Sequence, residues 1–223
     1  MKTYYECLPC FVRQALTSLK RSGASDERTQ EAMRAVFREL ASLDYEATPP
    51  EIAGGVYDAV GGAIGSYDPY ARDKALHNDF ALALLPHMQK RLRSEADRFE
   101  AKIKLAIAAN IIDLGKDAGL RKSDVQNCFD RALETPVDQS ALSSLRTAVH
   151  EADTILYLCD NAGEIVFDRF LIEEMPHTKV KAVVRGCPVI NDATLQDARC
   201  SGLADLVKVI TNGSGAPGTV LRT

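Results

Sequence analysis

The stretch TILYLCDNAGEIVF, residues 154–167, decides the fold. It begins with an apolar run at 154–159 that is typical of a buried strand, and then places an acid, an amide and a glycine where the chain has to turn. Two similar runs follow, KVKAVVRG at 179–186 and DLVKVIT at 205–211, and segments with helical character lie at 164–175 and 192–203. This β-α-β-α-β alternation predicts parallel strands with right-handed crossovers, and the near-continuous apolar runs suit strands that are covered on both faces.

The first 150 residues are expected to be helical. Apolar residues recur at spacings of three and four in two early segments, which predicts two amphipathic helices. The residues concerned are Leu8, Phe11, Ala15 and Leu19 in the first segment, and Met33, Val36, Phe37 and Leu40 in the second.

Two proline-containing sequences mark the starts of further helices. In TPPE, residues 48–51, Thr48 is expected at the N-cap, Pro49 in the first helical position and Glu51 in the place that completes a capping box. In DPY, residues 68–70, Asp68 is expected to cap the next helix.

The chain is therefore expected to be an α/β protein in two parts. A helical subdomain at 1–150 would precede a Rossmann-like, three-layer α/β/α domain at 151–223 with a mostly parallel sheet. Three strands make a thin sheet by the usual strand counts, so we expect either that helices of the first part supply unusual cover or that a C-terminal piece is missing after Thr223.

The helix predicted at 102–115, KIKLAIAANIIDLG, is apolar around nearly its whole circumference, so we expect it to be buried. Asn110 and Asp113 lie three residues apart on one face of it. A buried amide and carboxylate need partners, and these two are either satisfied structural groups or site residues.

Composition favours small molecules as partners. The net charge of −4 provides no basic surface for nucleic acid or for an anionic membrane. No run of 18 or more apolar residues is present and the N-terminus lacks a signal-peptide core, so we expect a cytoplasmic protein. The six cysteines are expected to be reduced, and nothing in the sequence indicates the oligomeric state.

Polar residues gather beyond the carboxyl ends of the three predicted strands, where ligands bind in open parallel sheets. They are Asp160, Asn161, Gly163 and Glu164 after the first strand, Arg185, Asn191, Asp192 and Thr194 after the second, and Asn212, Gly213 and Ser214 after the third.

Asp160, Asn161 and Asp192 form an all-oxygen donor set that suits Mg²⁺ or Mn²⁺ better than zinc. The alternative is that Asp160 or Asn161 caps the helix after the first strand, and that Asn191 or Asp192 caps the next one.

Other strand-end residues are candidates for work on a phosphate. Arg185 and the backbone N–H groups of NGSG, residues 212–215, are candidate phosphate donors, although an arginine at a strand end is often just a surface residue. Glu164 would either orient a water or hold the loop, and Asp197 is expected to be solvated rather than a ligand.

Cys7 and Cys10 form a Cys-x-x-Cys pair, but no second pair and no pair of spaced histidines completes a four-ligand zinc site. Metal binding and a redox role remain alternatives to burial in the first helix. The other four cysteines are expected in the core.

Four ordered blocks resemble the damage-control phosphatases, a family of metal-dependent phosphatases once known only as an unknown-function domain. The blocks are CLPCFVRQAL (7–16), AANIIDLG (108–115), CDNAGEIVFD (159–168) and VRGCPVINDATLQDA (184–198). The resemblance spans nearly the whole chain and is closest to the prokaryotic and archaeal branch with an N-terminal Cys-x-x-Cys.

The resemblance implies that Asp160, Asn161 and Asp192 are metal ligands and that Asn110 and Asp113 lie near the site. It implies a phosphatase that uses Mn²⁺, Mg²⁺, Co²⁺ or Ni²⁺ to hydrolyse small phosphorylated metabolites, such as sugar phosphates or damaged intermediates. Attack by a metal-activated water and attack by Asp160 itself both remain open. The family carries a later lysine and glycine-rich block that binds phosphate, and these 223 residues end before it.

Two other functions compete with the phosphatase. The first is a carboxyl methyltransferase that uses S-adenosylmethionine, an activity sometimes proposed for relatives of this family. The chain lacks the G-x-G-x-x-G turn after its first strand that would bind the adenosine part of this cofactor. The second alternative is a metal-binding module without catalysis.

Overall fold

The computed structural model describes residues 2–64, 68–112, 121–218 and 220. Its elements are η1 (Tyr5–Cys7), α1 (Leu8–Ser22), α2 (Asp26–Ala41), α3 (Pro49–Ile64), α4 (Ala71–Arg91), η2 (Leu92–Ser94), α5 (Arg98–Ala108), α7 (Lys122–Glu134), α8 (Gln139–Glu151), β1 (Ile155–Leu158), α9 (Glu164–Ile172), η3 (His177–Lys179), β2 (Val180–Val184), α10 (Leu195–Cys200), α11 (Leu203–Leu206) and β3 (Lys208–Thr211). The predicted α/β class is confirmed.

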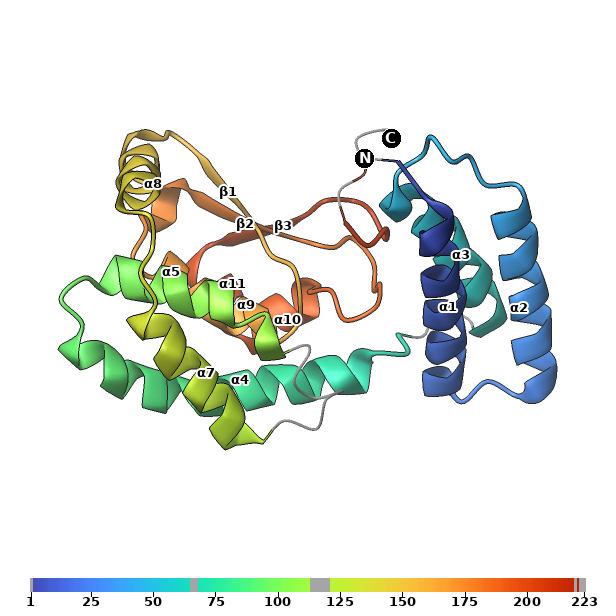
Figure 1. Ribbon diagram of the computed structural model, residues 1–223, viewed down its shortest axis with the longest axis horizontal. Coiled ribbons are helices and arrows are strands. Elements are labelled where there is room, and N and C mark those ends of the chain that lie inside the picture. Colours follow the sequence, from blue (N-terminus) through green and yellow to red (C-terminus); the bar gives the residue numbers. More distant parts are fainter. Residues whose placement is uncertain (1, 65–67, 113–120, 219, 221–223) are drawn as a thin grey trace. The chain divides into compact units, whose positions relative to one another are not determined.

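The three strands form one parallel sheet in the order β1-β2-β3 (Figure 1). Ile155 pairs with Val180 in the first ladder, and Lys181 pairs with Lys208 in the second. All three predicted strands are therefore confirmed, and each is shorter than its apolar run.

Cover on both faces, which the apolar runs predict for every strand, holds only for the central strand. In β2 four of the five residues are buried. In β1 the burial alternates, and Leu156 and Leu158 are 60% and 65% exposed. The prediction is wrong for β1 because this strand lies at the edge of the described sheet.

The chain forms two compact units. Unit 1 comprises Met1–Arg72, Arg185–Asp192 and Gly213–Thr223, and unit 2 comprises Asp73–Val184 and Ala193–Asn212. The domain boundary predicted near residue 150 stays a prediction, and β1 begins just after it at Ile155. The chain enters unit 1 again after β2 and after β3, so each of these strand ends supplies residues to both units.

Unit 1 is built on α1, α2 and α3, which lie side by side (Figure 1). Their apolar faces meet in a core that contains Phe11, Leu19, Val36 and Val56. The two amphipathic helices are confirmed, except that Phe37 is wrong as a core residue because 54% of its surface is exposed.

Both predicted helix starts are confirmed. The Thr48 backbone N–H donates to the Glu51 carboxylate at 2.6 Å, and α3 begins at Pro49. The Tyr70 N–H donates to Asp68 at 2.9 Å just before α4. Each carboxylate satisfies a backbone donor close to where a helix begins.

Unit 2 is organised around α9, of which only Glu164 and Arg169 are not buried. One side of α9 packs with α4, α5 and α7, where the Phe129 and Phe167 rings lie 4.7 Å apart. Its other side packs in a second core that includes Val180, Ala182 and Val184 of β2. Because α9 is held from both sides, the loop that leads into it has a fixed end.

Lys102 of α5 marks the far end of α9. Its side chain is buried, and Nζ lies 3.1 Å from Glu173 and 2.8 Å from Glu174. A buried ammonium group needs such partners, because desolvation is costly for an isolated charge.

The helix expected at 102–115 differs from its prediction. α5 ends at Ala108, Ile107 is 68% exposed, and Asn110 lies exposed in the following turn. The expectation of a fully buried helix is therefore wrong, because apolar residues on all sides of the segment do not show which of them find a packing partner. Asp113 lies outside the described residues.

No helix in the described ranges combines the length and apolar character required to cross a membrane. All six cysteines are free thiols, as expected. Cys159 is buried as expected, and Cys7 and Cys128 are only partly buried. Cys10, Cys187 and Cys200 are exposed, so the expected burial of these three is wrong.

Candidate active site

The loop between β1 and α9 carries the first candidate ligands. Asp160 is exposed, whereas Asn161 is 9% exposed. The N-cap of α9 is Gly163, which has no side chain to act as a cap, so the capping alternative for Asp160 and Asn161 is wrong.

Gly163 is required by the shape of this loop. Its φ of +85° is a conformation that other residues rarely adopt, and a Cβ there would lie 3.0 Å from Ile112 and 3.1 Å from the His77 carbonyl oxygen. The loop thus packs tightly against α4, where only a backbone without a side chain fits.

Glu164, the first residue of α9, lies between two amide side chains. Asn110 donates to Oε1 and Asn161 donates to Oε2, each at 3.4 Å. Because the Asn161 amide nitrogen is directed to Glu164, the carbonyl oxygen is the atom that Asn161 offers to a cation. Glu164 therefore orients Asn161, which favours the loop-holding interpretation of this glutamate.

A cleft of about 480 Å³ opens beside the end of β1. Its polar lining consists of Asn110, Tyr157, Asp160, Glu164 and Asp168, and the remaining lining residues are apolar. Among the described residues the cleft contains three carboxyl groups and no histidine, cysteine or basic side chain. The described lining is therefore acidic, and the atoms that it could offer to a metal ion are carboxylate, hydroxyl and amide oxygens.

The pKa of Asp168 reflects its burial and the negative charge of the neighbouring carboxylates in the cleft. Burial, assisted by the charges of Glu164 and Asp160, raises the pKa of Asp168 to about 7, while a hydrogen bond from Tyr157 opposes the rise. The Tyr157 hydroxyl donates to Asp168 Oδ1 at 2.7 Å. Burial and the same three carboxylates also raise the pKa of the Cys159 thiol, so this cysteine remains protonated.

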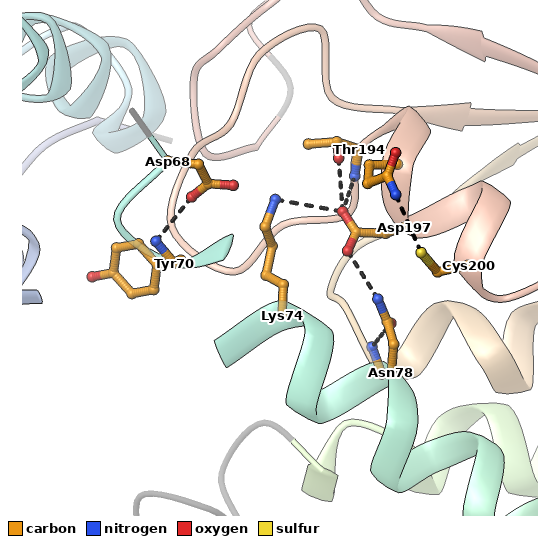
Figure 2. Close-up of polar contacts among 9 residues, drawn as sticks. Asp68, Tyr70, Lys74, Asn78, Thr194, Asp197 and Cys200 are labelled. Carbon is orange, nitrogen blue, oxygen red and sulfur yellow. Dashed lines mark hydrogen bonds and ion pairs between the residues drawn. The ribbon is translucent and has the colours of Figure 1, made fainter. Parts of the chain in front are cut away.

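A buried polar relay lies behind the loop (Figure 2). The Gly163 N–H donates to Asn78 Oδ1 at 2.7 Å, and Asn78 Nδ2 donates to Asp197 Oδ1 at 2.9 Å. Asp197 Oδ2 accepts from the Thr194 N–H at 2.8 Å, from the Thr194 hydroxyl at 2.7 Å and from Lys74 Nζ at 3.4 Å. Asp197 is 4% exposed, so the expectation that it is solvated is wrong.

Thr194 has the capping role that the sequence suggested for its neighbours. It is the N-cap of α10 and shares a capping box with Asp197, so the capping alternative for Asn191 and Asp192 is wrong. The adjacent Ala193 N–H donates to the Asp160 carbonyl oxygen at 2.6 Å.

Lys74 and Asn78 were not predicted from the sequence. A signal for them exists, because Lys74, His77 and Asn78 lie at the spacing that places them on one face of α4, and all three are buried. Buried polar residues on one helix face indicate a polar partner across the interface.

Arg185 and Asp192 lie together in unit 1. Arg185 Nε donates to Asp192 Oδ2 at 2.5 Å, and Nη1 donates to the Gly218 carbonyl oxygen at 2.7 Å. A charge-assisted bond of this kind fixes the carboxylate of Asp192. The structure therefore shows Arg185 as a partner of the candidate ligand.

The NGSG turn approaches the chain after β2. The Gly186 N–H donates to the Ser214 carbonyl oxygen at 2.9 Å, and a Cβ at Gly186 would lie 2.8 Å from Gly213. Gly213 has a φ of +72°, and the Asn212 N–H donates to the Val184 carbonyl oxygen. The turn is thus held by backbone contacts.

Two groups of predicted site residues result. Asn110, Asp160, Asn161, Gly163 and Glu164 come together in unit 2, while Arg185 and Asp192 pair in unit 1. No set of three or more His, Cys, Asp or Glu side chains within the described ranges is arranged to hold a metal. The convergence of Asp192 with Asp160 and Asn161 stays a prediction.

Comparison with known proteins gives consistent matches over nearly the whole chain. Residues 3–223 match the family model described as the damage-control phosphatase ARMT1-like domain. An uncharacterized protein of Methanocaldococcus jannaschii is 32% identical over 97% of this chain and 73% of its own. A damage-control phosphatase of Pyrococcus horikoshii is 30% identical over 100% of this chain and 77% of its own. A damage-control phosphatase of Archaeoglobus fulgidus is 28% identical over 99% of this chain and 78% of its own.

A solved structure has the same fold. The crystal structure of a DUF89 family protein from Pyrococcus horikoshii superposes with a TM-score of 0.84 at 29% sequence identity, covering 100% of this chain and 78% of that one.

Proposed function

Because the chain belongs to the damage-control phosphatase family with an ARMT1-like domain, we propose that it is a metal-dependent phosphatase. Its substrates in this proposal are small phosphorylated metabolites, such as sugar phosphates or damaged phosphometabolites. The cation is Mn²⁺, Mg²⁺, Co²⁺ or Ni²⁺, held by Asp160, Asn161 and Asp192.

The observation that carries the proposal is the acidic cleft at the end of β1. Asp160, Glu164 and Asp168 line it together, and their mutual repulsion contributes to the raised pKa of Asp168. Such a cleft repels a phosphate unless a cation offsets the charge. A phosphatase with this lining therefore needs a metal.

The donors fit a hard divalent cation. Asp160 offers a carboxylate, and Asn161 offers a carbonyl oxygen because Glu164 engages its amide nitrogen. The described residues that line the cleft include no histidine or cysteine that would favour zinc. When bound, such an ion neutralises phosphoryl oxygens and lowers the pKa of water.

The chain's own residues would perform the remaining tasks. Glu164 would hold Asn161 and Asn110 in place, and the apolar wall of the cleft would accommodate the non-phosphate part of the substrate. Arg185 would fix the Asp192 carboxylate, and N–H groups at 213–215 would serve as additional phosphate donors, because the Asn212 N–H is already bound to the Val184 carbonyl oxygen.

The test is release of inorganic phosphate from a panel of phosphometabolites with each of the four cations added. We expect the wild type to release phosphate and the Asp160→Ala variant to fall to background. Asp153→Ala is the matched control, because Asp153 is exposed and precedes β1 rather than following it. It is expected to keep full activity.

Three results are informative. Equal phosphate release by wild type and Asp160→Ala would remove Asp160 from the mechanism. Mn²⁺ binding without phosphate release on any substrate would favour the metal-binding module. Binding of S-adenosylmethionine, measured by calorimetry, would favour the methyltransferase.

A further inference from the structure

The buried relay through α4 connects two loops that carry candidate ligands, and its chain of contacts lies wholly in unit 2. At one end, the Gly163 N–H is bound by Asn78, and Gly163 closes the loop of Asp160 and Asn161. At the other end, Asp197 accepts from the N–H and the hydroxyl of Thr194, two residues after Asp192. We propose that Asn78 and Asp197 are positioning residues that hold these two loops in register for cation binding.

The geometry of Asn78 makes it specific for this task. Its carbonyl oxygen accepts from Gly163 while its amide nitrogen donates to Asp197, so one planar group bridges both partners at 2.7 and 2.9 Å. An amide side chain presents one fixed acceptor and one fixed donor side by side on a planar group, which suits this bridge. Asn78 is 2% exposed, so water cannot replace either bond without opening the core.

The charge of Asp197 is balanced within the same relay. Lys74 is 4% exposed and its Nζ lies 3.4 Å from Asp197 Oδ2. A buried carboxylate that accepts bonds from an ammonium, an amide, a hydroxyl and a backbone N–H keeps a single orientation. Asp197 can therefore act as a fixed point for both loops.

A direct backbone bond supports the same register. The Ala193 N–H donates to the Asp160 carbonyl oxygen at 2.6 Å, next to the relay's end at Thr194. The two loops are thus joined once through the backbone and once through α4. Groups that orient metal ligands in this way have measurable effects on metal affinity.

This inference rests on the proposed function and deepens it, so its test has one readout that needs no metal. Hydrogen exchange, followed by mass spectrometry on the 223-residue chain, reports on residues 160–166 and 193–200 separately. In Asn78→Ala both segments should exchange about tenfold faster, since the Gly163 N–H and Asp197 each lose a buried partner. Calorimetry with Mn²⁺ alone should show affinity weakened by about 10- to 100-fold.

A second variant separates the two links and guards against misfolding. Asp197→Asn has the same shape, and its amide oxygen can still accept from Asn78, which keeps its bond to Gly163; its amide nitrogen cannot accept from Thr194 or Lys74. It should accelerate exchange in residues 193–200 with little change in residues 160–166. Lys102→Met is the control, because it removes another buried, paired lysine at the opposite end of α9. It should leave Mn²⁺ affinity and both segments unchanged.

The outcomes distinguish the two proposals. Faster exchange in both segments together with weaker Mn²⁺ binding in Asn78→Ala supports the positioning role. Normal Mn²⁺ affinity in Asn78→Ala, or unchanged exchange in residues 193–200, overturns it while the proposed function stands. A wild type that binds no Mn²⁺ overturns the proposed metal site and this inference with it.

Discussion

Replacing Asp168 by asparagine should change how stability depends on pH. Burial raises the pKa of Asp168 from 3.8 to about 7 in the folded protein. In the unfolded chain the group ionises near its ordinary value, so between about pH 4 and pH 7 the folded state binds one more proton than the unfolded state. Stability therefore falls as the pH rises through this window.

The size of the effect follows from the two pKa values. A rise from 3.8 to about 7 corresponds to as much as ~4 kcal/mol of unfolding free energy at pH 8. The asparagine side chain of the variant does not ionise and can still accept the hydrogen bond from Tyr157. The variant should therefore not lose unfolding free energy from this group as the pH rises. We expect the two proteins to be nearly equally stable at pH 4 and to diverge up to pH 7.

Urea unfolding at pH values from 4 to 8 measures the difference. Tyr157→Phe serves as a second probe, because removal of the hydroxyl donor raises the pKa of Asp168 further and extends the loss of stability above pH 7. Parallel stability curves for wild type and Asp168→Asn would refute the reasoning, since Asp168 would then ionise equally in both states.

Two further predictions concern packing. Gly163→Ala should lower the free energy of unfolding, measured with urea, by about 1–3 kcal/mol. The φ of +85° is strained for alanine, and the added Cβ would press on α4. An unchanged free energy of unfolding would contradict this backbone conformation. Phe129→Ala should lower the free energy of unfolding by about 3–5 kcal/mol in the same assay, because Phe129 is fully buried against Phe167. A loss below about 1 kcal/mol would show that this core is loosely packed.

The sheet could be predicted because each strand has a local sequence pattern. Each apolar run at 154–159, 179–186 and 205–211 contains one observed strand, and helix starts at Thr48 and Asp68 follow from capping chemistry. Exposure could not be predicted in the same way. Leu156 and Leu158 are as apolar as the residues of β2, and only the order of strands shows that β1 lies at an edge.

The candidate site was predictable in part for a similar reason. Asp160, Asn161 and Glu164 are close in sequence and follow a strand, so their proximity follows from local structure. The burial of Asp197 depends on Lys74 and Asn78, which lie 123 and 119 residues away in the chain. The residues next to Asp197 in the sequence do not indicate such distant partners. The spacing of five residues from Asp192 predicted only a solvated carboxylate.

The central claim is that Asp160, Asn161 and Asp192 hold one divalent cation. Anomalous X-ray diffraction from crystals soaked with Mn²⁺ tests it most directly. We expect a single strong anomalous peak within coordination distance of oxygen atoms from all three side chains, about 2.0–2.3 Å away. A peak bound elsewhere, or one that omits Asp192 while contacting Asp160 and Asn161, would contradict the account.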